Sequence, residues 1–429
     1  MSNISRRTVL GTGSAFFGLS LAGWPTGAFA ADPLQVFGHK THETMSISGA
    51  GGDTTAPWTA ETGTPIAWTT FDIGPLQERL LRELSLNQTT LDIGYVLNTQ
   101  MTQQLAGLFE PLDDYQEKDP IENFEDIFPG FVEGMRVGGK LLSIPSRGPV
   151  PGLHYNEEIL AKRGFSKGPE TIEELAEIAK ACTYTEDGVS VVGYAIPLNY
   201  VSLVQMARAW NGDLITPDFK SVVQEPPMVK TVAMLADLYA AGALPRNVTS
   251  MTSEDPLTWM QTGRAAMYPG GFNRAVVFND PEKSQFPGKI KNMPMPTSEE
   301  TRAELGPYAP GTVEIWGMII PKNGLRKDLA WSFIKHMSSN KMQLDMQFNG
   351  NATVRRSVYE NEDIRKALSY ADAAKAALDS ARVALPAFDN ATRVADLFNE
   401  QVHLAVLGQK TAEQAMADAD AAIQPLLPA

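Results

Sequence analysis

The fold is decided by an apolar run, Leu91-Asp92-Ile93-Gly94-Tyr95-Val96-Leu97, whose length suits a mostly buried strand. A helix through Leu105 and Leu108 is expected to follow it. Two runs upstream, Leu34-Gln35-Val36-Phe37 and 65–71, are also strand-like, with helical stretches between them. Strands that alternate with helices predict an α/β domain with a mainly parallel sheet.

Capping boxes mark two helix starts further along the chain. Thr171-Ile172-Glu173-Glu174 precedes apolar residues at helical spacing, and Thr411-Ala412-Glu413-Gln414 opens a last, alanine-rich helix. The lone cysteine, Cys182, falls on the apolar face of the first of these helices. We interpret Cys182 as a small buried hydrophobic residue.

The composition is that of an acidic globular protein. The chain has 429 residues, of which 43% are hydrophobic, and carries 36 basic against 50 acidic residues. This length exceeds what a single core usually supports, which predicts two or three domains. The negative charge argues against nucleic acid or an anionic membrane as partner. It leaves the ligand open, because an acidic protein can still contain a local cationic pocket.

The N-terminus has the pattern of an export signal, predicted over residues 1–31. Ser5-Arg6-Arg7-Thr8-Val9-Leu10 is followed by a short apolar stretch and by Ala28-Phe29-Ala30. The paired arginines resemble a twin-arginine signal. Val9 stands where that signal usually has Phe, so both the twin-arginine and the Sec route remain open. The segment contains no cysteine, and we therefore expect a periplasmic protein without a lipid anchor.

Several segments, in their order along the chain, resemble the family 1 extracellular solute-binding proteins of ABC transporters, the group that contains maltose-binding protein. The segments that carry the resemblance are Leu108-Phe109-Glu110-Pro111-Leu112-Asp113-Asp114-Tyr115, Gly138-Gly139-Lys140-Leu141-Leu142-Ser143-Ile144-Pro145, Leu153-His154-Tyr155-Asn156, Trp210-Asn211-Gly212-Asp213, Gly263-Arg264-Ala265-Ala266-Met267, Trp316-Gly317-Met318-Ile319-Ile320-Pro321 and Ala330-Trp331-Ser332-Phe333-Ile334-Lys335. They span nearly the whole chain after the signal.

This resemblance implies the periplasmic-binding-protein fold, with two α/β lobes, a ligand cleft between them and a hinge that the chain crosses three times. The crossings are expected near Ile144–Arg147, Tyr268–Gly271 and Ile315–Pro321. The first lobe would then comprise residues 32–144 and 271–314, and the second lobe 148–268 and 320–429.

The resemblance also implies a function. We expect a monomeric binding protein without cofactor, metal or catalysis, which captures a small carbohydrate or sugar alcohol for the transmembrane subunits of an ABC permease. A secreted glycan-acting enzyme and a sensory binding protein for a chemoreceptor are the alternatives. The enzyme has no support from a nucleophile elbow, a zincin motif or a P-loop.

Candidate ligand contacts were sought in loops that follow strands. Sugars stack on flat aromatic rings and need planar polar groups for their hydroxyls. The candidates are His39 and Lys40 after the first strand, Asn98 after the third, Arg147 and Tyr155 at the first crossing, Trp210, Asn273, Glu314 and Trp316, and Arg355 late in the chain. Asn98 could instead cap a helix, and surface solvation is the alternative for Arg355. A metal site at His39, His42 and Glu43 is not expected, because their spacing is not H-E-x-x-H.

Overall fold

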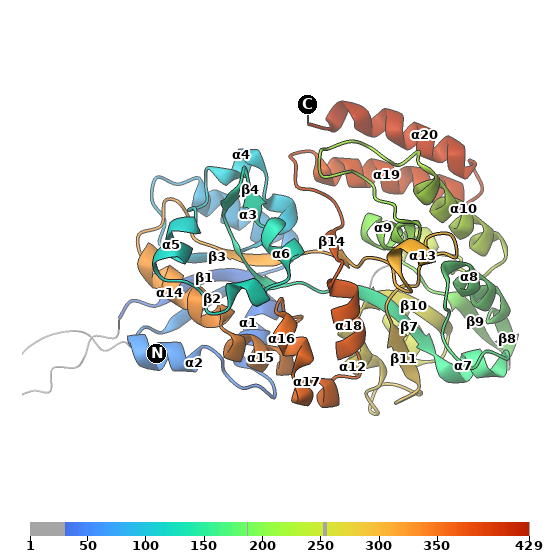
Figure 1. Cartoon of the computed structure of the whole chain (residues 1–429), viewed down its shortest axis with the longest axis horizontal. Coiled ribbons are helices and arrows are strands. Elements are labelled where there is room, and N and C mark those ends of the chain that lie inside the picture. Colours follow the sequence, from blue (N-terminus) through green and yellow to red (C-terminus); the bar gives the residue numbers. More distant parts are fainter. Residues whose placement is uncertain (1–30, 187, 252–254, 429) are drawn as a thin grey trace, which may run out of the picture.

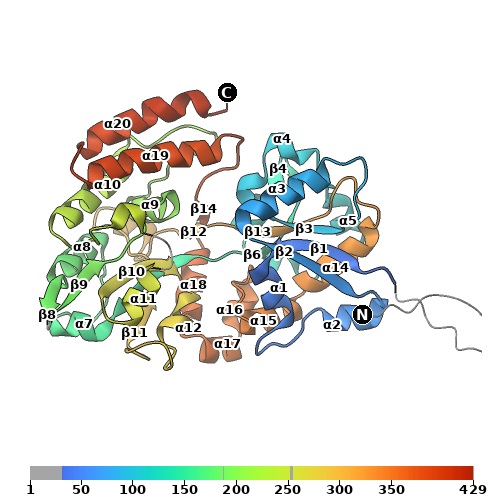
Figure 2. The ribbon, with the colours of Figure 1, turned by 180° about the vertical axis from the view of Figure 1, so that it is seen from behind.

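The computed structural model describes residues 31–186, 188–251 and 255–428, which form two α/β lobes side by side (Figures 1 and 2). The predicted two-lobed fold is thereby confirmed. The paired arginines and the Ala28-Phe29-Ala30 segment lie outside the described residues. Among the helices of the described part, none is long and apolar enough to cross a bilayer.

The first lobe is built on a sheet with the order β2-β1-β3-β13-β6. Its strands are β2 (Ile66–Phe71), β1 (Leu34–His39), β3 (Ile93–Leu97), β13 (Trp316–Ile319) and β6 (Ile144–Arg147). The three predicted strands are β1, β2 and β3, which run parallel, whereas β13 is antiparallel to both of its neighbours.

The second lobe has a sheet with the order β11-β7-β10-β9-β8. Its strands are β11 (Ile290–Met293), β7 (Pro151–Asn156), β10 (Ala265–Gly271), β9 (Val189–Tyr194) and β8 (Tyr184–Glu186). β7 runs antiparallel to β10 and β11. Glycine is needed where β7 and β10 meet, because a Cβ on Gly152 would lie 2.2 Å from the Phe272 ring.

Helices cover both sheets, and each begins and ends within its own lobe. Those of the first lobe are α1 (Lys40–Ile47), α2 (Ala56–Thr62), α3 (Ile73–Leu84), η1 (Asn98–Gln100), α4 (Gln103–Ala106), α5 (Asp113–Lys118), η2 (Phe124–Asp126), α6 (Pro129–Glu133), α14 (Lys327–Ser338), α15 (Asn340–Phe348), α16 (Arg356–Glu360), α17 (Glu362–Ala367) and α18 (Ala371–Leu378). A short hairpin, β4 (Arg136–Val137) with β5 (Lys140–Leu141), accompanies them.

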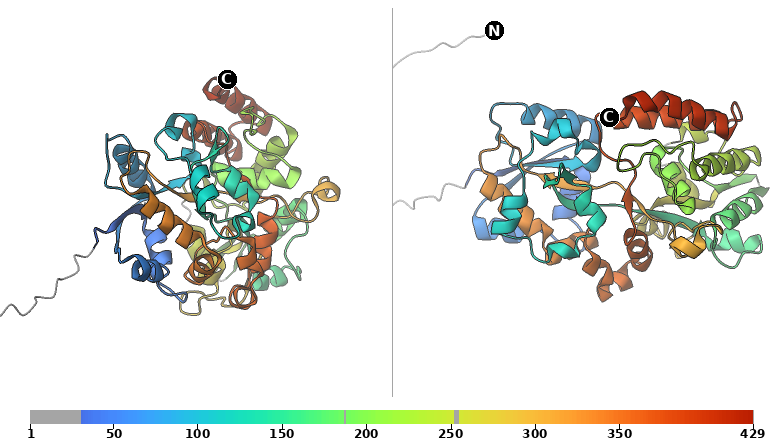
Figure 3. Two further views of the ribbon diagram at one scale, coloured as in Figure 1. Left: turned by 60° about the vertical axis from the view of Figure 1, so that its left-hand side comes forward. Right: turned by 45° about the horizontal axis from the view of Figure 1, so that its top comes forward.

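The second lobe carries the remaining helices. They are α7 (Glu157–Lys162), α8 (Ile172–Ala181), α9 (Tyr200–Ala207), η3 (Arg208–Trp210), α10 (Pro226–Ala240), η4 (Val248–Ser250), α11 (Asp255–Gln261), α12 (Arg274–Phe278), α13 (Arg302–Leu305), α19 (Ala391–Val406), α20 (Ala412–Ile423) and η5 (Gln424–Leu426). α20 lies along α19 on the outside of this lobe (Figure 3). Of the two predicted capping boxes, Thr411 forms a full box with Gln414. The Thr171 hydroxyl accepts from Glu174 N–H as predicted, but the Glu174 carboxylate accepts from Glu170 N–H instead of Thr171 N–H, so the first box is only half formed. Cys182 is buried, as predicted.

The chain passes between the lobes at three places, of which two are strands paired with each other. The first passage joins β6 to β7. The second is β12 (Thr312–Val313), which leads into β13, and the third is β14 (Arg382–Val383), which pairs in parallel with β12.

A buried arginine of the second lobe fastens β12 and β14 together. Arg208 is fully buried, and its guanidinium donates to Asp213 Oδ1 at 2.9–3.0 Å. It also donates to the Gly311 and Arg382 carbonyl oxygens, the Thr312 hydroxyl and the Val383 carbonyl oxygen, at 2.6–3.1 Å. Both crossing strands are therefore held to the start of η3 by one side chain.

The composition of the two cores corrects the expected lobe boundaries. The first core contains buried residues from Leu34 to Val150, Phe272 and Ala275, and buried residues from Val313 to Leu378. The second core includes the chain again from Leu385 to Ile423. The segment 271–314 was expected in the first lobe, yet β11 pairs with β7, and Met295 packs in the second core. The segment 320–429 was expected wholly in the second lobe, yet α14 to α18 pack on the first.

The error has a physical reason. Tyr268–Gly271 is rich in Pro and Gly because it ends β10 against β7, not because the chain changes lobes there. The actual passages lie at β12 and at β14, and nothing in the short sequence Arg382-Val383 distinguishes it from an ordinary loop.

Candidate functional site

One edge of the first sheet faces the passages between the lobes. At this edge, His39 at the end of β1 pairs with Phe71 of β2. Trp316 at the start of β13 pairs with Leu97 of β3 and with Arg147 of β6. The carboxyl ends of parallel strands are where α/β sheets hold their ligands. Of the predicted contacts, the structure brings His39, Trp316 and Arg147 together here.

Aromatic rings gather behind this edge. The His42 ring stacks on Tyr95 at 4.2 Å between centroids and meets Trp316 edge to face at 4.8 Å. The Trp68 ring also stacks on Tyr95, at 6.0 Å between centroids. Burial raises the pKa of Tyr95 and lowers the pKa of His42 well below its usual range, so that neither ring is charged at neutral pH. The rings form a neutral cluster in which His42, Tyr95 and Trp316 are buried and Trp68 is half-buried, and such rings at a sheet edge are of the kind on which sugar C–H faces stack.

His39 and His42 also build the start of α1. The Thr41 N–H donates to His39 Nδ1 at 3.2 Å, and the His39 N–H donates to His42 Nδ1 at 3.1 Å. The Nδ1 atom of each ring is therefore an acceptor, and in the neutral His42 ring the proton is on Nε2. Lys40 is strongly exposed in the same turn and forms an ion pair with Glu43 at 3.8 Å.

The second passage between the lobes presents a carboxylate. Glu314 lies between β12 and β13, and its Oε1 accepts a hydrogen bond of 3.0 Å from the Tyr200 hydroxyl at the start of α9. Burial raises the pKa of Glu314, while the bond from Tyr200 and the charge of Arg147 act in the opposite direction. Burial and the adjacent Glu314 raise the pKa of Tyr200, which remains a hydroxyl donor.

A pocket of about 370 Å³ opens at this point, and its walls come from the second lobe and from the passages. It is lined by Pro149, Pro151, Pro197, Asn199, Tyr200, Val201, Ser202, Gln205, Tyr268, Pro269, Gly270, Gly271, Thr312 and Glu314. Its volume is in the range of small-molecule sites. The predicted contact Asn273 lies two residues after its glycine pair and lines a separate small cavity with Phe272 and Tyr370.

Four predicted contacts lie elsewhere. Asn98 is buried and bonds the backbone of Ile315 in both directions at 2.8 Å, so it fastens the second passage. Trp210 is 8% exposed and packs in the core of the second lobe. Tyr155 lies at the end of β7 away from the first passage and packs against Gly168.

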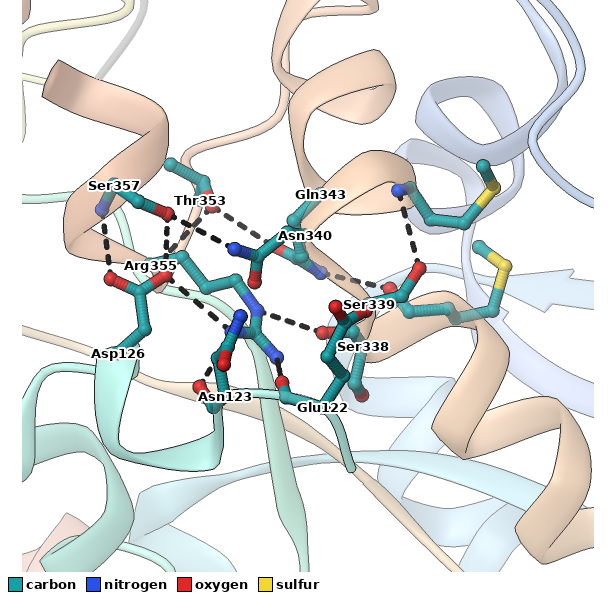
Figure 4. Close-up of polar contacts among 12 residues, drawn as sticks. Glu122, Asn123, Asp126, Ser338, Ser339, Asn340, Gln343, Thr353, Arg355 and Ser357 are labelled. Atoms are coloured by element: carbon teal, nitrogen blue, oxygen red, sulfur yellow. Dashed lines mark hydrogen bonds and ion pairs between the residues drawn. The ribbon is translucent and has the colours of Figure 1, made fainter. Parts of the chain in front are cut away.

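Arg355 is the fourth correction, because it is a structural residue inside the first lobe. Its guanidinium donates to the backbone carbonyls of Ser338, Asn123 and Glu122 at 2.7–2.8 Å and meets Asp126 at 3.4 Å (Figure 4). The side chain is fully buried, so it reaches neither solvent nor the cleft.

Sequence reasoning missed several residues of the site, namely His42, Trp68, Tyr95, Tyr200 and Tyr268. Tyr200 could have been found, since it follows the carboxyl end of β9 through Asn199, whose side chain caps α9. Tyr95 and Trp68 lie inside predicted strands, where an aromatic residue is ordinarily core.

Comparison with known proteins gives a consistent result. The family model for bacterial extracellular solute-binding proteins matches residues 47–344. A probable ABC transporter-binding protein of Deinococcus radiodurans is 24% identical over 269 residues, which cover 60% of this chain and 62% of that protein's length.

Solved structures of solute-binding proteins have a fold similar to that of this chain. Maltose-bound MalE3 of T. maritima has a TM-score of 0.76 at 21% identity, covering 92% of this chain and all of that one. A ribitol-bound solute-binding protein of Agrobacterium radiobacter K84 has a TM-score of 0.76 at 19% identity, covering 92% and 99%. A D-mannitol-bound protein of Agrobacterium vitis S4 has a TM-score of 0.72 at 20% identity, covering 93% and 100%. By the extent of the family match, the chain belongs to the bacterial extracellular solute-binding proteins.

Proposed function

We propose that this protein is the periplasmic binding component of an ABC importer, which captures a small carbohydrate or sugar alcohol between its lobes and delivers it to a membrane permease. The observation that carries the proposal is the meeting of neutral aromatic rings with the half-buried Glu314 carboxylate and the half-buried Arg147 guanidinium at the passages between the lobes. Polyhydroxylated molecules need both a ring to stack on and planar charged groups for their hydroxyls.

The side chains that we expect to contact the ligand come from both lobes, and this suggests how it binds. His42 and Trp316 come from the first lobe, and Tyr200 and Tyr268 from the second. A ligand that touches both sets favours the closed arrangement, because only that arrangement offers it all contacts at once. Maltose, ribitol and D-mannitol are the ligands of the similar structures, which supports this ligand class.

The proposed role includes no reaction on the ligand. Glu314, the carboxylate of the pocket, accepts the Tyr200 hydroxyl bond, and we assign both to hydroxyl recognition. Membership of the binding-protein family supports the same reading.

Titration calorimetry with a panel of sugars and polyols tests the proposal. Tyr200→Ala removes a ring and a hydroxyl that line the pocket, and we expect it to weaken binding at least about tenfold, the effect of one hydrogen bond to a charged group. Tyr308→Ala is the matched control, because Tyr308 is an exposed tyrosine of the second lobe outside the pocket. Equal affinities for both variants would place the binding site elsewhere.

A further inference from the structure

His42 has a second polar atom, which the start of α1 does not use. Its Nδ1 accepts from the His39 N–H at 3.1 Å and thereby completes the capping box of this helix. A glutamate or glutamine commonly fills this position of a capping box, because one acceptor atom is enough there. The imidazole ring also has Nε2, and with Nδ1 as the acceptor the neutral ring carries its proton on Nε2. Capping of the helix does not require this donor.

The ring is packed tightly at the sheet edge of the candidate site. It is 5% exposed and lies 4.2 Å from the Tyr95 ring on β3 and 4.8 Å from the Trp316 ring on β13, between centroids. Its Nδ1 is on the side of β1, because a Cβ added to Gly38 would lie 3.4 Å from that atom. Since β1, β3 and β13 are neighbours in this order, the ring extends from β1 across Tyr95 toward Trp316.

The Nε2–H group of His42 has no acceptor in the described part of the chain. No residue there forms a hydrogen bond with this atom, and the atom is not one of the buried nitrogens without a partner. Nε2 is therefore the accessible tip of a ring that is otherwise buried. His154, His336 and His403 differ from His42, because each of them has Nε2 within 2.8–3.2 Å of a backbone carbonyl oxygen.

Arg147 connects His42 with the pocket that Glu314 lines. Burial, and next the charge of Arg147, lower the pKa of His42. Burial lowers the pKa of Arg147, and the charge of Glu314 acts in the opposite direction. Arg147 is also paired with Trp316 at the end of β6. A guanidinium contains only donors, and the free atom of His42 is a donor too, whereas the Glu314 carboxylate is an acceptor. The side of the site that the first lobe provides is thus suited to ligand oxygen atoms.

We propose that His42 is a specificity-determining residue, whose Nε2–H donates a hydrogen bond to an oxygen atom of the bound carbohydrate or polyol. This rests on the proposed function, because the ligand must lie at the sheet edge between the lobes. A hydroxyl or ring oxygen accepts such a bond, whereas the CH₂ group of a deoxy sugar and the ammonium group of an amino sugar cannot. His42 therefore narrows the ligand class to molecules that place an oxygen acceptor beside Trp316.

NMR of the unmodified protein with ¹⁵N-labelled histidine tests the proposal, with ribitol, D-mannitol and maltose as probes. In the free protein we expect the proton of the His42 ring on Nε2 and none on Nδ1. Saturation with a probe that binds should shift the His42 Nε2–H resonance and slow its exchange with water, because the probe replaces water as acceptor. His336 is the control within the same molecule. Its Nε2 already lies 2.8 Å from the Thr54 carbonyl oxygen, so its resonance should not change.

Two variants measure the contribution of this bond by titration calorimetry with the same probes. His42→Phe keeps a flat ring but has no N–H, and should weaken binding about threefold to tenfold, the range for one neutral hydrogen bond. His42→Gln keeps an acceptor for the His39 N–H and an amide donor, and should recover part of the loss.

The outcomes separate this proposal from the proposed function. A bound probe that leaves the His42 Nε2–H resonance unchanged, a proton on Nδ1, or equal affinities of His42→Phe and the unmodified protein would overturn the role of His42 and leave the proposed function intact. The NMR measurement decides this even if His42→Phe does not fold. Binding of no probe by the unmodified protein would overturn both.

Discussion

Replacing Arg208 by lysine tests whether one side chain controls how the lobes are held. The structure shows six hydrogen bonds from the Arg208 guanidinium, to Asp213, to Gly311 and Thr312 at the start of β12, and to both residues of β14. A lysine ammonium keeps the charge beside Asp213, but it is a single point and cannot reach both strands.

The cost can be worked from these contacts. An ammonium has three N–H groups for the five acceptor atoms, so at least two of the acceptors lose their donor. Each buried unsatisfied acceptor costs roughly 1–3 kcal/mol, and water entering at the passage recovers part of this. We therefore expect Arg208→Lys to lower the free energy of unfolding by about 3 kcal/mol, within the range for a disrupted buried ion pair.

Arg355→Lys is the matched control. Arg355 is as deeply buried and donates to three backbone carbonyls and a carboxylate, but all of them belong to the first lobe. Both variants should unfold at lower temperature in calorimetry. Only Arg208→Lys should enlarge the radius of gyration of the ligand-free protein in solution scattering, because only it frees the strands between the lobes. An unchanged stability for Arg208→Lys, or an equal change in scattering for Arg355→Lys, would refute the reasoning.

Three further substitutions test the account, each by thermal unfolding. Burial raises the pKa of Glu314, so the protein loses stability as pH rises and this carboxyl group ionises. Glu314→Gln keeps an acceptor for Tyr200 and stays neutral, so it should unfold at a higher temperature than the parent at pH 8. This gain should fade toward pH 4, where Glu314 is itself protonated. A gain that grows in acid would contradict this. Burial lowers the pKa of His154 to about 4, so the free energy of unfolding of the parent should fall by up to about 3 kcal/mol as pH falls from 6.5 to 4. His154→Gln should make the stability less dependent on pH in this range. An unchanged pH dependence would mean that other groups cause it. Gly152→Ala should cost about 1–3 kcal/mol because its Cβ would overlap the Phe272 ring, whereas Gly107→Ala, in open space, should be neutral; equal effects would be inconsistent with the packing described.

The strands and the two-lobed fold could be predicted because their signals are local. Each apolar run of the first sheet is complete within a few residues and is flanked by turn residues. Lobe membership could not be predicted in the same way. β11 reads Ile290-Lys291-Asn292-Met293, and only its pairing with β7, far back in the chain, shows which sheet it joins.

The site residues that lie at strand ends could be predicted from the sequence. Whether a polar residue faces the site or is buried inside a lobe could not be predicted. His39, Arg147 and Trp316 end strands at one sheet edge, so the rule that ligands lie at strand ends finds them. Arg355 and Arg147 look alike in sequence. Their difference lies in backbone carbonyls at Glu122 and Asn123, more than two hundred residues before Arg355, which no local pattern reveals.

Native mass spectrometry of the purified protein with a panel of neutral and anionic sugars and polyols tests whether it is a binding protein for these molecules. We expect a complex of one protein with one ligand, whose bound mass stays that of the intact ligand over hours and whose population falls in Tyr200→Ala. The absence of a complex with every member of the panel, or a bound mass that changes with time because the ligand is cleaved, would contradict a binding protein for this class of molecule.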